Sequence, residues 1–95
     1  MIEGGYVKEV IIYTGFLCRY CKMAKSFFTN KNIKYKEINI HKNPDKKKDM
    51  IKLSRGRITI PQIFIGETYI GGWNDLYQLN IEKGLNKILQ KEGIK

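Results

Sequence analysis

The only two cysteines of the chain lie three residues apart, in the run Cys18-Arg19-Tyr20-Cys21. The run follows an apolar stretch, Val10 to Tyr13, and precedes a stretch with helical periodicity. Residues three apart on a helix have Cβ atoms roughly 5–6 Å apart, and a disulfide needs Cα atoms about 4.4–6.8 Å apart. The spacing therefore predicts a pair that opens and closes a disulfide with little backbone movement, which is thiol-disulfide redox chemistry.

Cys18 is expected at the N-terminus of the helix, with Cys21 one turn deeper. A helix N-terminus presents unpaired N–H groups and about half a positive charge, which favour a thiolate over a thiol. Three basic residues, Arg19, Lys22 and Lys25, add positive charge nearby. Such surroundings lower the pKa of a cysteine thiol. We therefore expect Cys18 to be the attacking thiolate and Cys21 the resolving thiol.

Two other interpretations of the cysteine pair are a structural disulfide and half of a zinc site. Closing so short a loop removes little entropy from the unfolded chain, which argues against a structural disulfide. A zinc site needs about four ligands, and the only other strong candidate is His41. We interpret His41 as a solvated loop residue and expect no metal to be required, because C-x-x-C near a βαβ pattern is typical of redox proteins.

Length and composition indicate one domain, residues 1–95, with a modest core, since 42% of the residues are hydrophobic. No stretch approaches the ~20 apolar residues of a membrane span, and Met1 to Gly5 lacks the features of a signal peptide. We expect a cytoplasmic protein with no membrane partner. The cytosol keeps thiols reduced, so a C-x-x-C pair there is more often a redox-active pair than a structural disulfide.

The formal net charge is +9, but the lysines are spread along the chain. The small run Lys46-Lys47-Lys48 is best explained as a solvated helix face, because nucleic-acid sites combine clustered cations with aromatic residues. We therefore expect no specific nucleic-acid partner. The positive surface would still steer anionic thiols and acidic proteins toward the site.

The elements that position the cysteines follow from periodicity and from helix-breaking residues. The expected strands are Lys8 to Tyr13, Tyr35 to Ile40, Gln62 to Ile65 and Thr68 to Ile70, the last two joined by Gly66-Glu67. The first helix repeats apolar residues at Tyr20, Met23, Ala24, Phe27 and Phe28, and the second runs from the Asn43-Pro44 cap toward Gly56. A third is expected after a cap at Asn74 and Asp75, and a fourth around Leu85, Ile88 and Leu89. This βαβα then ββα order predicts an α/β protein, a small mixed sheet with helices on its faces.

Three motifs resemble those of the glutaredoxins: Cys18-Arg19-Tyr20-Cys21, Thr59-Ile60-Pro61-Gln62-Ile63-Phe64-Ile65 and Gly71-Gly72-Trp73-Asn74-Asp75-Leu76. The resemblance extends from Val10 to Leu89. It implies a thioredoxin-like fold with a four-stranded sheet and glutathione as co-substrate. It also implies a monomer that reduces protein disulfides and protein-glutathione mixed disulfides through a redox-active disulfide, as part of electron transport and cell redox homeostasis.

The resemblance assigns roles to individual residues. Cys18 would be the nucleophile and Cys21 would resolve protein disulfides. Tyr20 would line the glutathione groove, although an aromatic residue on this helix could equally belong to the core. Thr59 and Ile60 would precede a cis proline, Pro61, and expose backbone that pairs with glutathione as an added strand does.

The same resemblance places the glutamyl end of glutathione at the third helix. Gly72, Asn74 and Asp75 would hold it, because helix N-termini bind carboxylates and Asp75 can meet an ammonium; Asn74 can also simply cap the helix. Arg57 or Lys22 would meet the glycyl carboxylate, although an exposed arginine near a loop is often only solvated.

Two positions depart from the pattern of many dithiol glutaredoxins. Arg19 stands where they carry proline, and Gly15 stands where they carry lysine. Arg19 could replace the missing cation, whereas the lack of proline leaves the loop less restrained. In related members such a loop lets two subunits and two glutathiones hold a [2Fe-2S] cluster through the first cysteine, and this dimer is the alternative function.

Overall fold

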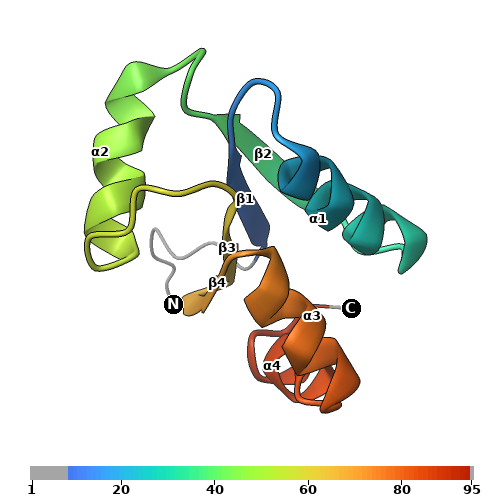
Figure 1. The fold of residues 1–95 in the computed structure, drawn as a ribbon. Helices are drawn as coiled ribbons and strands as arrows, with labels where there is room; N and C mark the ends of the chain where they lie inside the picture. The colour runs from blue at the N-terminus through green and yellow to red at the C-terminus, as the bar shows by residue number, and fades with distance from the viewer. Residues whose placement is uncertain (1–8, 95) are drawn as a thin grey trace.

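The computed structural model describes residues 9–94 of the chain. Lys8, the predicted start of the first strand, and Met1 to Gly5 lie outside the described residues. The elements, shown in Figure 1, are β1 (Val10–Thr14), α1 (Arg19–Asn30), β2 (Tyr35–Asn39), α2 (Pro44–Leu53), β3 (Gln62–Ile65), β4 (Thr68–Gly71), α3 (Trp73–Ile81) and α4 (Leu85–Lys91).

The strands form one sheet in the order β2-β1-β3-β4. β1 runs parallel to β2 and antiparallel to β3, and β3 runs antiparallel to β4. Ile65 pairs with Thr68, so Gly66 and Glu67 are the two residues of the hairpin turn. The predicted α/β class and the small mixed four-stranded sheet are confirmed.

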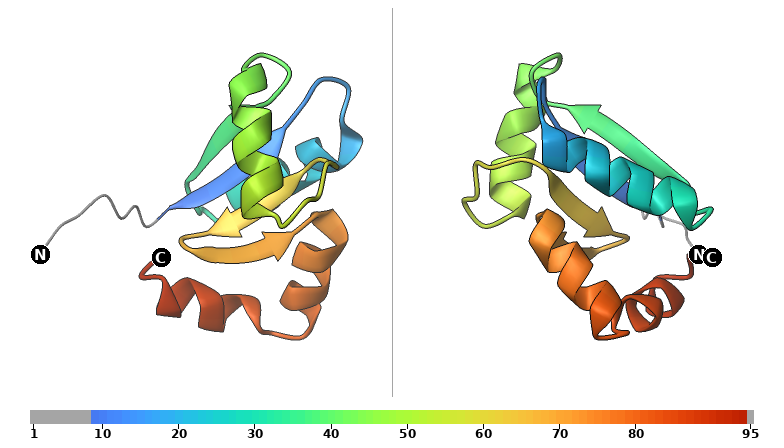
Figure 2. Two further views of the ribbon diagram at one scale, coloured as in Figure 1. Left: turned by 90° about the vertical axis from the view of Figure 1, so that its left-hand side faces the viewer. Right: turned by 45° about the vertical axis from the view of Figure 1, so that its right-hand side comes forward.

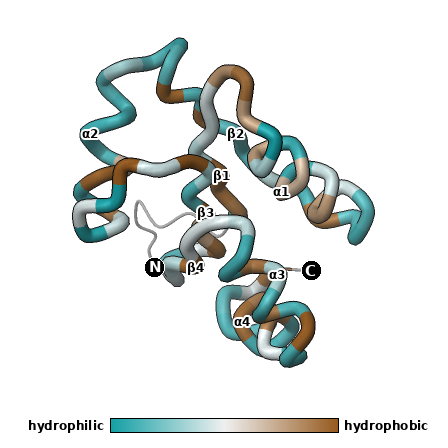
Figure 3. The backbone as a smooth tube through the Cα atoms, in the orientation of Figure 1, coloured by the Kyte–Doolittle hydropathy of each residue, from teal (hydrophilic) through white to brown (hydrophobic). Residues whose placement is uncertain are grey.

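Helices cover both faces of the sheet, with α2 on one face and α1, α3 and α4 on the other (Figures 1 and 2). Side chains alternate along β1, because successive strand residues point to opposite faces. Val10 and Ile12 are buried among Phe28 and Leu76 of the α1 and α3 side, whereas Tyr13 packs near Met50 of α2. Figure 3 shows hydrophobic segments in β1 and in the helices α3 and α4, while much of α2 is hydrophilic.

Helix α2 turns one narrow face to the sheet. Met50 is fully buried, and the run Lys46-Lys47-Lys48 is exposed, as the sequence predicts. Asn43 and Pro44 begin the helix as predicted, but the Asn43 side chain donates to the Asn39 carbonyl and makes no capping hydrogen bond. The lysine run therefore lies on a solvated helix face.

Helix α3 begins two residues earlier than predicted. Its N-cap is Gly72, and its first residue is Trp73, so Asn74 and Asp75 lie inside the first turn. The reason is that the carboxylate of Asp75 reaches back to accept the Gly72 N–H, at 2.9 Å. Within residues 9–94, no helix is long and apolar enough to cross a membrane.

Candidate functional site

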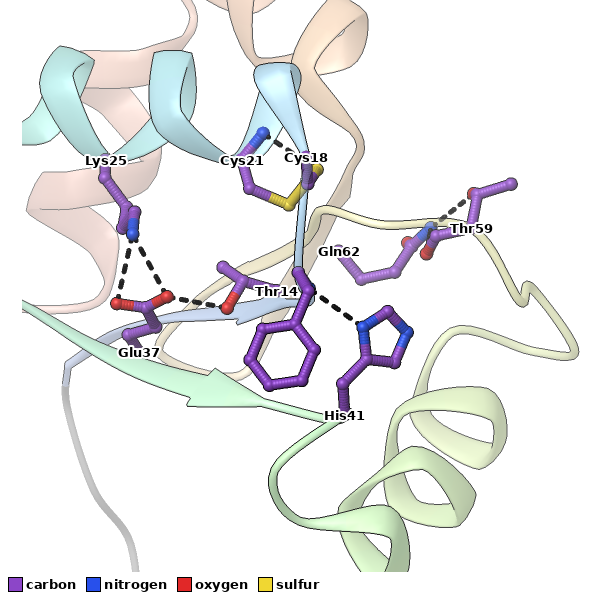
Figure 4. The surroundings of a disulfide bond; sticks show 9 residues. Thr14, Cys18, Cys21, Lys25, Glu37, His41, Thr59 and Gln62 are labelled. Carbon is purple, nitrogen blue, oxygen red and sulfur yellow. Dashed lines mark hydrogen bonds and ion pairs between the residues drawn. A yellow bond between two sulfur atoms is a disulfide. The ribbon is translucent and has the colours of Figure 1, made fainter.

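The two cysteines lie at the start of α1 and form a disulfide with a Cα–Cα distance of 5.2 Å, within the range that the spacing predicts. Cys18 is the N-cap residue, and Cys21 occupies the first turn. Cys21 is only 2% exposed, whereas Cys18 is partly exposed. One sulfur is therefore reachable from solvent and the other lies behind it (Figure 4).

The backbone of α1 directs a hydrogen-bond donor at Cys18. The N–H of Cys21 points at the Cys18 Sγ, with an N–S distance of 3.1 Å. After reduction the same donor would face a thiolate, and a hydrogen bond to a charged form stabilises that form. Helix geometry therefore contributes to the reactivity of the exposed sulfur through an atom of the buried cysteine.

Lys25, one of the three basic residues expected near Cys18, forms an ion pair with an acidic residue. Its Nζ pairs with Glu37 of β2, at 3.1 Å, and Thr14 donates its hydroxyl to the same carboxylate, at 2.7 Å (Figure 4). Partial burial by itself would raise the pKa of Glu37, but the hydrogen bonds from Thr14 and Lys25 and the charges of Lys25 and Lys42 outweigh it. The pKa of this carboxyl is therefore below its ordinary value of 4.5. The positive charge expected from Lys25 is therefore accompanied by the negative charge of a carboxylate on the neighbouring strand.

A groove of about 240 Å³ opens between the start of α1, the segment before β3 and the start of α3. Eight of the nine residues predicted to bind glutathione line it: Tyr20, Arg57, Thr59, Ile60, Pro61, Gly72, Asn74 and Asp75. The ninth, Lys22, lies along a separate hollow on α1 with Lys25 and Ser26. Trp73, which the sequence analysis did not single out for binding, also lines the groove.

Tyr20 connects the groove to the cysteine pair. It stands between Cys18 and Cys21 in the chain, and its side chain is 52% exposed. The alternative assignment of Tyr20 to the core is therefore wrong. The buried positions of α1 are Cys21, Ala24 and Phe28, whereas Tyr20, in the first turn of the helix, lines the groove.

The floor of the groove is held by a buried amide. The Ile60–Pro61 peptide bond is cis, as the resemblance implied. Gln62, which is fully buried, donates from its Nε2 to the carbonyl and to the hydroxyl of Thr59, both at 3.0 Å, and Tyr69 donates to its Oε1, at 2.5 Å. Gln62 and Tyr69 were not singled out from the sequence, although a polar residue opening the apolar run of β3 was a usable signal.

At the other wall, the turn into α3 brings backbone and carboxylate together. Gly71 has φ of 115°, and a Cβ there would lie 2.3 Å from the Asp75 Oδ2. The positive φ favours glycine at this position, and the absence of a Cβ leaves room for the Asp75 carboxylate. Arg57 reaches the same carboxylate, with Nη1 3.6 Å from Oδ2.

His41 contacts the loop that leads to Cys18. His41 is an exposed residue in the turn after β2, as predicted, and its Nδ1 also accepts the N–H of Phe16, at 2.8 Å. Among the described residues, no group of three or more His, Cys, Asp or Glu side chains is placed to hold a metal ion. The imidazole thus has a backbone partner.

Comparisons with known proteins agree on one family. Residues 10–70 match the family model described as glutaredoxin. The chain is 44% identical over 82 residues to glutaredoxin 3 of Escherichia coli K12, covering 86% of this chain and 98% of that protein. It is 40% identical over 84 residues to glutaredoxin 1 of Rickettsia prowazekii, covering 87% and 88% of the two chains.

Solved structures show the same fold. The solution structure of a glutaredoxin from Brucella melitensis has a TM-score of 0.74 and 41% identity, with 95% of each chain covered. A crystal structure of a buckwheat glutaredoxin-glutathione complex has a TM-score of 0.78 at 23% identity, covering 88% of this chain and 78% of that one. The second likeness supports the thioredoxin-like fold alone.

Proposed function

This chain belongs to the glutaredoxin family and reduces disulfides with glutathione, and on that premise we propose which residues perform each step. The observation that carries the proposal is the position of the pair. Cys18 is reachable at the N-cap of α1, Cys21 is buried behind it, and Tyr20 between them lines the groove. The substrates that fit are protein-glutathione mixed disulfides and protein disulfides.

Deglutathionylation needs only Cys18. Its thiolate attacks the glutathionyl sulfur in line, forms a Cys18-glutathione disulfide and expels the target protein as a thiolate. A second glutathione thiolate then attacks the glutathionyl sulfur, which releases glutathione disulfide and restores the Cys18 thiolate. The Cys21 N–H stabilises Cys18 both as attacking and as leaving thiolate, and an acidic leaving thiol leaves faster.

Reduction of a protein disulfide also needs Cys21. The Cys18 thiolate attacks one sulfur of the target disulfide and forms a mixed disulfide with it, while the target S–S bond breaks and the other target sulfur leaves as a thiolate. Cys21 then attacks Cys18, expels the second target thiolate and closes the Cys18–Cys21 disulfide, the state that this structure has. Two glutathiones then reduce that disulfide to the two thiols and leave as glutathione disulfide. Because Cys21 lies one helical turn from Cys18, this second attack needs little backbone movement.

Glutathione would lie in the groove beside the pair. We place its cysteinyl backbone along Ile60, next to the cis proline, and its glutamyl carboxylate at the N–H groups that start α3. Asp75 would receive the glutamyl ammonium and Arg57 the glycyl carboxylate. These placements are supported by the eight predicted residues that share one groove; Lys22 is the weaker candidate because it lines another hollow.

The test is turnover of a glutathionylated peptide with glutathione and a recycling system for glutathione disulfide. Cys21→Ser should keep this activity, and Cys18→Ser should abolish it. The two variants are a matched pair, because each removes one sulfur of the same disulfide. If Cys18→Ser retained turnover, the assignment of the nucleophile would be wrong.

We further propose a cytoplasmic monomer that requires no metal. The absorbance spectrum and gel-filtration volume of the freshly purified protein test this together. A colourless monomer is expected. A brown dimer that dissociates when its colour is lost would instead support the [2Fe-2S] alternative, in which Cys18 is the protein ligand.

A further inference from the structure

The loop between β1 and α1, residues 15–17, is joined to the end of β2 by one side chain. The Nδ1 of His41 accepts the backbone N–H of Phe16, at 2.8 Å, and the two aromatic rings lie 5.4 Å apart at an interplanar angle of 41°. Figure 4 shows His41 reaching from the end of β2 toward the strand that leads to Cys18. The contact is made two residues before the reactive sulfur.

This loop has little packing of its own to hold it. Leu17 has φ of 53°, in the left-handed region that a leucine rarely adopts, and its side chain is fully exposed, at 104%. Phe16 is 54% exposed. Because neither side chain is buried, the hydrogen bond from the Phe16 N–H, together with the contact between the Phe16 and His41 rings, helps to connect this part of the loop to the body of the protein.

The backbone around His41 is held by hydrogen bonds. The backbone N–H of His41 donates to the Oδ1 of Asn39, at 2.9 Å, and the backbone N–H of Lys42 donates to the same oxygen, at 3.1 Å. The backbone N–H of Ile40, the residue between Asn39 and His41, donates to the Thr14 carbonyl of β1, at 2.9 Å. The segment that carries His41 is thus tied to the sheet on both sides of the residue.

Gly15 is matched to this imidazole. A Cβ at Gly15 would lie 2.6 Å and 2.7 Å from ring atoms of His41 and 2.5 Å from the Cδ1 of Ile60. The ring and the Ile60 side chain thus occupy the space that a side chain at position 15 would need. The glycine lets His41 come close enough for its Nδ1 to reach the next N–H.

We propose that His41 is a positioning residue for the exchange reaction. Through the Phe16 N–H it fixes the loop, and so holds the Cys18 sulfur at the N-cap of α1 where the Cys21 N–H meets it. The bond requires an Nδ1 that carries no proton, so the neutral ring is protonated at Nε2. This inference rests on the proposed function, because the step it assists is the attack by Cys18.

The test compares three substitutions at position 41. In His41→Asn the side-chain oxygen takes the place of Nδ1 and can still accept the Phe16 N–H. In His41→Gln the acceptor is one carbon further out, and in His41→Leu there is none. Each is measured by kcat/KM for a glutathionylated peptide and by hydrogen exchange of the Phe16 amide, with a thermal melt to show folding.

His41→Asn should keep near-native kcat/KM and a protected Phe16 amide. The other two should lose about three- to ten-fold in kcat/KM, the range expected for one net hydrogen bond, with faster exchange at Phe16. Equal activity in all variants, or equal loss in all three, would overturn the proposal. An inactive wild type would refute the proposed function instead, and Phe16 exchange in the Asn and Gln variants would still decide whether His41 holds the loop.

Discussion

Arg57 and Asp75 lie on one side of the groove, with the guanidinium Nη1 3.6 Å from the carboxylate Oδ2. They come from different elements, Arg57 from the segment before β3 and Asp75 from the first turn of α3. The resemblance assigned them to opposite ends of glutathione. A ligand with an ammonium and a carboxylate can separate this ion pair by offering each charge a new partner, so binding exchanges one set of ionic contacts for another.

Removing either charge should therefore weaken glutathione binding moderately. Both side chains are about half exposed, at 54% and 48%, and exposed ion pairs are weak. We expect Arg57→Gln and Asp75→Asn each to raise KM for glutathione about two- to five-fold. Arg55→Gln is the matched control, because Arg55 lines a different hollow. Coupled kinetics at varied glutathione check this, and an unchanged KM in both groove variants would remove the pair from the binding site.

We expect Tyr69→Phe to destabilise the protein, because it removes a hydrogen bond to the buried amide of Gln62. The Tyr69 hydroxyl donates to the Gln62 Oε1, and Gln62 is fully buried, so the substitution leaves that oxygen without its donor. Such a loss lowers the free energy of unfolding by about 1–3 kcal/mol. Urea unfolding measures it. Tyr77→Phe is the control, because Tyr77 is 50% exposed and should change stability by less than about 0.5 kcal/mol. Equal effects of the two variants would contradict the role given to Gln62.

The ionised carboxylate of Glu37 should stabilise the folded protein near neutral pH, and this contribution should be lost in acid. Its pKa in the folded protein is below the ordinary value of 4.5, so the contribution is complete above that value and is lost as the pH falls through the folded pKa. The advantage of the wild type over Glu37→Gln should be present at pH 7 and shrink toward pH 3. Since the Glu37 side chain is 35% exposed, we expect this difference in the free energy of unfolding to stay below about 1 kcal/mol.

Urea unfolding at several pH values measures this difference. Lys25→Met serves as the matched variant, because it removes the ammonium that pairs with Glu37 and should reduce the pH dependence. An advantage that is constant or grows toward low pH would show that the carboxylate is not stabilised in the folded protein.

We expect the Cys18 thiol to ionise, and therefore to be alkylated, at a lower pH than the thiol of free cysteine. In reduced Cys21→Ser only the exposed thiol remains, at the N-terminus of α1 with the N–H of residue 21 directed at it. The rate with iodoacetamide should rise with a midpoint well below the ~8.5 of an ordinary thiol. Cys18→Ser is the control, because Cys21 is 2% exposed and should react slowly. A midpoint above ~8 for Cys18 would contradict the electrostatic argument.

The sequence by itself determined the redox chemistry and most of the fold. Three-residue spacing of Cys18 and Cys21 at a helix start suffices to predict a reversible disulfide, because it depends only on local geometry. Short apolar runs, rich in β-branched residues in the first strand and bounded by residues typical of turns, likewise predict the strands, since such runs are typical of strands buried in a sheet. The groove residues were also predicted, through motifs whose order along the chain matched the family.

Only the tertiary structure decided which charges and polar groups meet. Lys25 pairs with Glu37, Arg57 with Asp75, and His41 with the N–H of Phe16, over separations of 12 to 25 residues along the chain. No local pattern encodes such contacts, because they depend on how β2 lies beside β1 and how α3 follows β4. The order of strands in the sheet therefore determines how Cys18 is surrounded, whereas the spacing of the cysteines determines what Cys18 can do.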